Sequence, residues 1–183
     1  MHHAPLVASL AKVLPRTRQA GETQIVRPTN KNPIYQKLRS GKMSKKRIFI
    51  SFDYDHDRNY RYLLKALAAN PRSDIEFDDL TPEEIQSYDI SRIKAVLTTK
   101  IREATHTLVI VGAYANSYHP DRVKIGERNW QWWEIKKSAE EGNRFIAVKI
   151  KSTNDTPEPL YGKNATWAMS FSVDSIIAAI DKA

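Results

Sequence analysis

With 183 residues, the chain is long enough for one domain with a real hydrophobic core, plus an extension. It contains no cysteine, which excludes disulfides, thiolate metal sites and cysteine nucleophiles. No apolar run approaches the ~20 residues that span a bilayer, so we expect a cytoplasmic protein without a membrane partner.

The formal net charge of +8 is concentrated near the N-terminus. Residues 1–46 hold ten lysines and arginines against a single glutamate, so residues 47–183 carry a net charge of −1. We therefore predict a flexible basic extension over residues 1–44 and a folded domain over residues 45–183. A basic arm could touch nucleic acid or acidic lipid, but a solvated tail is the simpler interpretation, and nucleic acid is not expected as a partner.

Beyond the extension, apolar runs typical of buried strands alternate with stretches of helical period. The first strand is predicted over residues 47–52, and Asp57 is expected to cap a helix that ends before Pro71. A short strand over 75–78 and an acidic loop over 79–87 precede a second helix, which has apolar residues at 90, 93, 97 and 101.

The second half of the chain continues the alternation. A continuous apolar strand is predicted over 105–111 and a loop over 113–127. A tryptophan-rich helix then runs from Trp130 to a Gly-Asn stop at 142 and 143. Strands are predicted over 145–150 and 166–171, and a helix with apolar residues at 173, 176, 177 and 180 closes the chain.

Strands that alternate with helices pair in parallel through right-handed crossovers. Continuous apolar strands agree, because a parallel sheet is covered on both faces. We therefore predict an α/β fold, namely a flavodoxin-like three-layer sandwich with a five-stranded, mainly parallel sheet. In such folds ligands bind beyond the carboxyl ends of the strands, where strand order reverses. The loops over 51–57, 78–87 and 112–127 should line that edge.

Several known chemistries lack their motifs in these loops. The loop over residues 53–57 is acidic and has no glycine, which argues against a phosphate cradle, and neither Gly-x-Gly-x-x-Gly nor a P-loop pattern occurs. The third strand is followed by glycine and alanine rather than aspartate, which argues against a phospho-receiver domain. Asp53, Asp55 and Asp57 could bind a divalent cation, but a helix cap beside two solvated acids is the favoured interpretation, and no metal is expected.

The tryptophan-rich segment is the most informative part of the chain. On a helix, Trp130, Trp133 and Glu134 are neighbours, because residues three and four apart share a face. A carboxylate packed against indole rings can simply be the polar residue at the edge of a hydrophobic core. It can also be a site where the carboxylate meets a flat cationic or hydroxylated ligand.

The body of the chain resembles the TIR-like family that includes the signal-generating TIR subunit of bacterial Thoeris anti-phage systems. The resemblance rests on the strands over 47–52 and 108–112, on Trp130-x-x-x-Glu134-Ile135 with Ser138, and on Glu141-Gly142-Asn143. It implies a flavodoxin-like fold and cleavage of the nicotinamide–ribose bond of NAD, with a cyclic ADP-ribose-type nucleotide as signal. It also implies NAD as substrate with no cofactor, a homo-oligomer, and an effector protein reached through a diffusible signal.

By position, Glu134 matches the catalytic glutamate of the family. We expect the substrate to be bound around it by residues from three loops and from the tryptophan-rich helix: Ser51, Phe52, Asp53, Asp79, Asn116, Trp130 and Trp133. A carboxylate can stabilise the oxocarbenium-like ribose that remains when nicotinamide leaves. Aromatic rings can stack on the adenine or nicotinamide of NAD.

Each of these assignments has a structural alternative. Phe52 and the tryptophans could be core residues, and Asn116 a turn former. The whole domain could instead be a non-catalytic TIR-like interaction module in signal transduction, with exposed tryptophans and the acidic loop over 78–84 mediating assembly.

Overall fold

The computed structural model describes residues 46–69, 75–78, 84–85 and 87–183. The predicted basic extension over residues 1–44 therefore lies outside the described residues, as do most of the acidic loop and Asp79. Among the residues that the structure describes, no helix is long and apolar enough to cross a membrane.

The sheet has five strands in the order β2-β1-β3-β4-β5, and all four pairings are parallel. The strands are β1 (Lys46–Ser51), β2 (Ile75–Asp78), β3 (His106–Val111), β4 (Arg144–Lys149) and β5 (Thr166–Ala168). Each lies where the apolar runs predicted it, although β5 ends three residues early. This is the strand order of flavodoxin, which confirms the predicted fold class.

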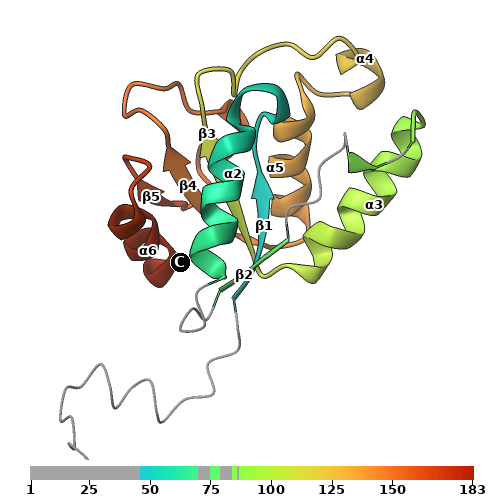
Figure 1. Ribbon diagram of the computed structural model, residues 1–183. Coiled ribbons are helices and arrows are strands. Elements are labelled where there is room, and N and C mark those ends of the chain that lie inside the picture. Colours follow the sequence, from blue (N-terminus) through green and yellow to red (C-terminus); the bar gives the residue numbers. More distant parts are fainter. Residues whose placement is uncertain (1–45, 70–74, 79–83, 86) are drawn as a thin grey trace, which may run out of the picture. The chain divides into compact units, whose positions relative to one another are not determined.

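Helices cover both faces of the sheet (Figure 1). The long helices are α2 (Tyr54–Ala68), α3 (Ile90–Glu103), α5 (Trp130–Glu140) and α6 (Val173–Lys182), with a short α4 (Arg122–Ile125) and the 3-10 turn η2 (Glu158–Leu160) in loops. Helices α2 and α6 pack on one face of the sheet, and α3 and α5 pack on the other.

Strand β1 illustrates why the buried strands read as continuous apolar runs. Ile48 and Ile50 face Leu64 of α2, whereas Phe49 between them faces Leu97 of α3. Successive side chains of a strand point to opposite faces, and both faces are covered here, so apolar residues are favoured at successive positions. All six residues of β3 are buried for the same reason.

Helix α2 begins one turn earlier than predicted. Its N-cap is Asp53, whose carboxylate accepts a 3.0 Å hydrogen bond from the backbone N–H of His56. The prediction that Asp57 caps this helix is therefore wrong, because Asp57 lies inside the helix and is buried with Arg61 and Leu64. Arg61 forms an ion pair with Glu84 at 2.8 Å. Asp57 and Arg61 occupy inward-facing positions in the first turns of α2. Because both are charged, the apolar pattern that predicts a helix is absent there.

The strand order reverses between β1 and β3. The chain leaves β1 for β2 on one side and then crosses to β3 on the other. The carboxyl ends of β1 and β3 point toward the top of Figure 1 and form the switch point, where ligands bind in folds of this type.

Candidate active site

Glu134 lies at this switch point. It is in the second turn of α5, its side chain is 3% exposed, and its Oε2 accepts a 2.6 Å hydrogen bond from the hydroxyl of Ser51, the last residue of β1. The start of α5 is fixed by its N-cap, Asn129, which accepts from the N–H of Trp132 at 2.9 Å. The Asn129 amide also donates to two carbonyls of the loop after β3, those of Ala115 and Ser117.

Gln131 ties the two strand ends together. Its Nε2 donates to the carbonyl of Ile110 in β3 at 2.8 Å and to that of Ser51 in β1 at 3.3 Å. The side chain is 2% exposed, and its Oε1 has no hydrogen-bond partner. Sequence analysis missed Gln131, although it stands three residues before Glu134 and so shares its helix face.

Asp57 approaches the same switch point from the α2 face of the sheet. It is 4% exposed, and its Oδ2 has no hydrogen-bond partner. A Cβ atom placed on Gly112, the residue after β3, would lie 2.0 Å from this oxygen, so the carboxylate and the glycine backbone are in direct contact. The pKa of Asp57 is raised from 3.8 to about 6, chiefly by burial and further by the Asp53 carboxylate, whereas His56 opposes the shift.

Asp53, predicted to bind substrate, is occupied by the first turn of α2. Besides capping the helix, its Oδ1 lies 2.7 Å from Nδ1 of His56. The His56 ring stacks on Tyr114 with 3.7 Å between centroids, which links α2 to the loop after β3. Within the described part of the chain, no group of three or more histidine, aspartate or glutamate side chains is placed to hold a metal ion.

The predicted aromatic residues lie in packed surroundings. Phe52 is in the core with Leu64, and Trp130 is in the core with Phe49. Trp133 is half-buried and meets Trp130 edge to face at 6.0 Å between centroids. Trp130 and Trp133 therefore contribute to packing on the α3 side of the sheet, and their binding of substrate stays a prediction.

Asn116 is held by both ends of its amide. Its Oδ1 accepts from the indole N–H of Trp132 at 3.1 Å, and its Nδ2 donates to the carbonyl of Asp155 at 3.2 Å. The Arg128 guanidinium donates to the Asn116 carbonyl and lies over the rings of Trp132 and Tyr118, at 4.6 and 4.7 Å. Asn116 thus fastens the loop after β3 to α5 in this structure, and a ligand that used its amide would replace these bonds.

Two further residues of the tryptophan-to-asparagine segment form a buried polar network. Thr107 of β3 donates a 2.8 Å hydrogen bond to Ser138 of α5, and Asn143 donates to Thr107 Oγ1 and to the carbonyl of Ile101. The network joins α3, β3 and α5 below the site. Ser138 and Asn143 therefore hold the helix that carries Glu134, and neither lies at the carboxyl ends of the strands.

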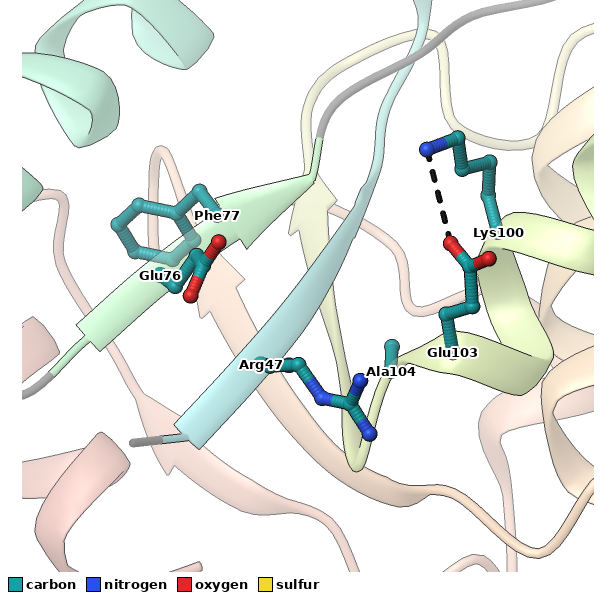
Figure 2. A pocket seen from close by; sticks show the side chains of 6 residues that line it. All are labelled: Arg47, Glu76, Phe77, Lys100, Glu103 and Ala104. Carbon is teal, nitrogen blue, oxygen red and sulfur yellow. Dashed lines mark ion pairs between the residues drawn. The ribbon is translucent and has the colours of Figure 1, made fainter. Parts of the chain in front are cut away.

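A pocket of about 260 Å³ lies elsewhere, where β1 begins and α3 ends (Figure 2). It is lined by Arg47, Glu76, Phe77, Lys100, Glu103 and Ala104, and Lys100 forms an ion pair with Glu103 at 3.6 Å. No residue predicted to form the active site is among them. Its lining holds two cationic and two anionic side chains.

The chain was compared with known proteins and structures. A family model described as the TIR-like domain of Thoeris protein ThsB matches residues 49–155, more than half of the chain. No curated protein matches.

Among solved structures, a prokaryotic SEFIR domain shares 14% identity, with a TM-score of 0.48 over 75% of this chain and 94% of that one. Two 2-deoxyribosyltransferases share 12% identity with TM-scores of 0.45. The one from Bacillus psychrosaccharolyticus covers 66% of this chain and 84% of its own, and the one from Leishmania mexicana covers 75% and 97%. These likenesses concern the fold alone. The family match over residues 49–155 identifies the chain as a member of the Thoeris ThsB TIR-like domain family.

Proposed function

We propose that this domain cleaves the nicotinamide–ribose bond of NAD and produces a nucleotide signal in anti-phage defence. One observation carries the proposal: the buried carboxylate of Glu134 is held by the Ser51 hydroxyl at the switch point of the sheet. Folds of this type bind ligands there. The family to which the chain belongs supports the same reading.

The chemistry requires little more than one well-held carboxylate. Departure of nicotinamide leaves positive charge on the ribose, and an adjacent carboxylate stabilises this charge or holds the ribose hydroxyls. The leaving group needs no protonation, because the pyridinium nitrogen becomes neutral as the bond breaks. Burial strengthens the effect, since charges interact more strongly where water is excluded. Ser51 restrains one carboxylate oxygen, which reduces the reorganisation needed during reaction.

The wider assignments belong to the same proposal. NAD is the substrate and no cofactor is needed. The enzyme acts as a homo-oligomer in the cytoplasm, and its product reaches an effector protein by diffusion. Substrate binding by Phe52, Trp130 and Trp133 is part of this proposal, and it requires these packed rings to move toward the strand ends.

A non-catalytic interaction module is the second candidate, and the 3% exposure of Glu134 favours it, because a catalytic carboxylate must reach its substrate. Assembly through exposed tryptophans has weaker support, since Trp130 and Trp132 are both buried. The two candidates differ in whether nicotinamide is released.

The test is nicotinamide release by the full chain, both purified and produced in phage-infected cells. Glu134→Gln keeps the shape of the side chain and removes its charge, so turnover should fall about 10²- to 10³-fold, the range seen for loss of one electrostatic group. Glu140→Gln is the matched control, because Glu140 is an exposed residue on the same helix and pairs with Lys137. Equal turnover in Glu134→Gln and wild type, at equal Tm, would refute the proposal.

A further inference from the structure

The carboxyl group of Asp57 is buried near the candidate active site and has no role in the function proposed so far. Asp57 is 4% exposed, and its Oδ2 has no hydrogen-bond partner. A buried, unpartnered carboxylate oxygen costs free energy, so folded proteins seldom keep one without a functional reason. Among the buried side-chain oxygens of the described residues, the only other one without a hydrogen-bond partner belongs to Gln131, which bridges the ends of β1 and β3.

Asp57 and Glu134 flank the switch point from opposite faces of the sheet. Asp57 is on α2, which packs on the face shared with α6, and it contacts Gly112 just beyond the end of β3. Glu134 is on α5, on the other face, and contacts Ser51 at the end of β1. Enzymes that cleave glycosidic bonds commonly use two carboxyl groups on opposite sides of the reacting carbon, one of which acts on the incoming nucleophile.

We propose that Asp57 is a second catalytic group of this site, which accepts the proton lost by the nucleophile that attacks the ribose carbon. The inference rests on the proposed NAD cleavage and extends it. The bond between nicotinamide and ribose breaks, and its electron pair stays on the nicotinamide nitrogen. A bond forms between the ribose carbon and water, or a hydroxyl or amine of the nucleotide itself. The nucleophile's proton passes to Oδ2 of Asp57 and then to solvent, so that one proton is released per NAD consumed.

Gly112 makes this arrangement sterically feasible. Any side chain there would begin 2.0 Å from Oδ2 of Asp57, so glycine is required for the strand end to approach the carboxylate. Because Gly112 has no side chain, the Asp57 carboxylate can face the carboxyl ends of the strands, where substrate is expected.

The charges around Asp57 suit a base. Its neighbours on α2 are Asp53, which raises its pKa, and His56, which lowers it. Arg61 follows one turn later on the same inward face and is paired with Glu84. From the loop after β3, Gly112 contributes no charge and Tyr114 stacks on His56. With a pKa of about 6, Asp57 is mostly ionised at neutral pH and yet holds a proton better than an ordinary aspartate. A general base is most effective when its pKa lies near the working pH.

The test compares Asp57→Asn with wild type by nicotinamide release across pH 5 to 8, and it includes Asp55→Asn as a control. Asp55 is exposed on the same helical turn. We expect wild-type turnover to decline below about pH 6. Asp57→Asn should lose at least about 10²-fold in turnover at neutral pH and should lack this decline. Asp57→Ala should be rescued by formate, a small carboxylate that fits the vacated space. The Tm of Asp57→Asn at neutral pH should equal or exceed that of wild type.

Three outcomes would overturn the inference. Unchanged turnover and pH profile in Asp57→Asn, with activity still lost in Glu134→Gln, would reject the role of Asp57 alone. A lower Tm with no rescue by formate would assign Asp57 a structural role. Absence of nicotinamide release by wild type, in purified form and in infected cells, would reject the proposed function and this inference with it.

Discussion

The Ser51 hydroxyl donates a 2.6 Å hydrogen bond to the Glu134 carboxylate, although the two residues are 83 positions apart in the chain. Ser51 ends β1, and its Cα partner in β3 is Val109. Glu134 reaches it because α5 packs against β3 and β4 with Ile135 fully buried. The orientation of the Glu134 carboxylate therefore depends on the register of the sheet and on how α5 packs against it.

Replacement of Ser51 by alanine should reduce NAD turnover by about 10- to 100-fold, because a hydrogen bond to a charged group contributes roughly 1.5–3 kcal/mol. The effect should fall on kcat more than on KM, since the hydroxyl acts through Glu134 rather than through substrate. Ser172→Ala is the control, because Ser172 is exposed at the start of α6. A kinetic profile equal to that of wild type would show that Ser51 does not orient Glu134 for reaction.

Gly112→Ala should destabilise the wild-type protein by about 1–3 kcal/mol, because its new Cβ would lie 2.0 Å from the Asp57 carboxylate. In an Asp57→Ala background the same change should cost much less, since the opposing carboxylate is gone. Urea unfolding of the four proteins gives the coupling free energy. Equal costs in the two backgrounds would contradict the contact between Gly112 and Asp57.

The stability difference between Asp57→Asn and wild type should depend on pH. The pKa of Asp57 in the folded state, about 6, lies above its ordinary value of 3.8, so the folded state binds the proton more tightly than the unfolded state. Relative to Asp57→Asn, wild type therefore loses up to about 3 kcal/mol of stability as pH rises from about 4 to about 6. Urea unfolding at several pH values measures this difference, with Asp55→Asn as control. A difference that stays constant with pH would mean that Asp57 is solvated.

Asn143→Ala should lower the free energy of unfolding by about 2 kcal/mol or more, because it removes two hydrogen bonds, to the carbonyl of Ile101 and to Thr107 Oγ1. Turnover per folded molecule should change little, since Asn143 lies away from the carboxyl ends of the strands. Asn59→Ala, at an exposed position of α2, is the control. A large loss of turnover at unchanged stability would place Asn143 in the site after all.

Sequence analysis predicted the elements whose signals are local. The apolar spacing of residues 90–101 predicted a helix, and α3 buries Ile93, Leu97 and Ile101. The continuous run before Gly112 predicted a strand covered on both faces, and β3 is buried throughout. Such signals are reliable because the period of side-chain direction is a property of the backbone itself. The start of α2 was missed, because Asp57 and Arg61 interrupt its inward face.

The sequence by itself therefore determined the alternation of strands and helices and the parallel sheet, and it singled out the segment around Glu134 as the candidate site. Sequence analysis expected Ser51 near Glu134, but only the tertiary structure decided which of the expected side chains meet there and which others join them. Ser51 and Gln131 converge on the strand ends through register and helix packing, and Asp57 turns inward because Gly112 admits it. Aspartates at 53 and 57 are equally good helix caps by residue type, and the choice between them was made by the contact of α2 with the sheet. Contacts between residues far apart in the chain depend on the whole fold, and no local period encodes them.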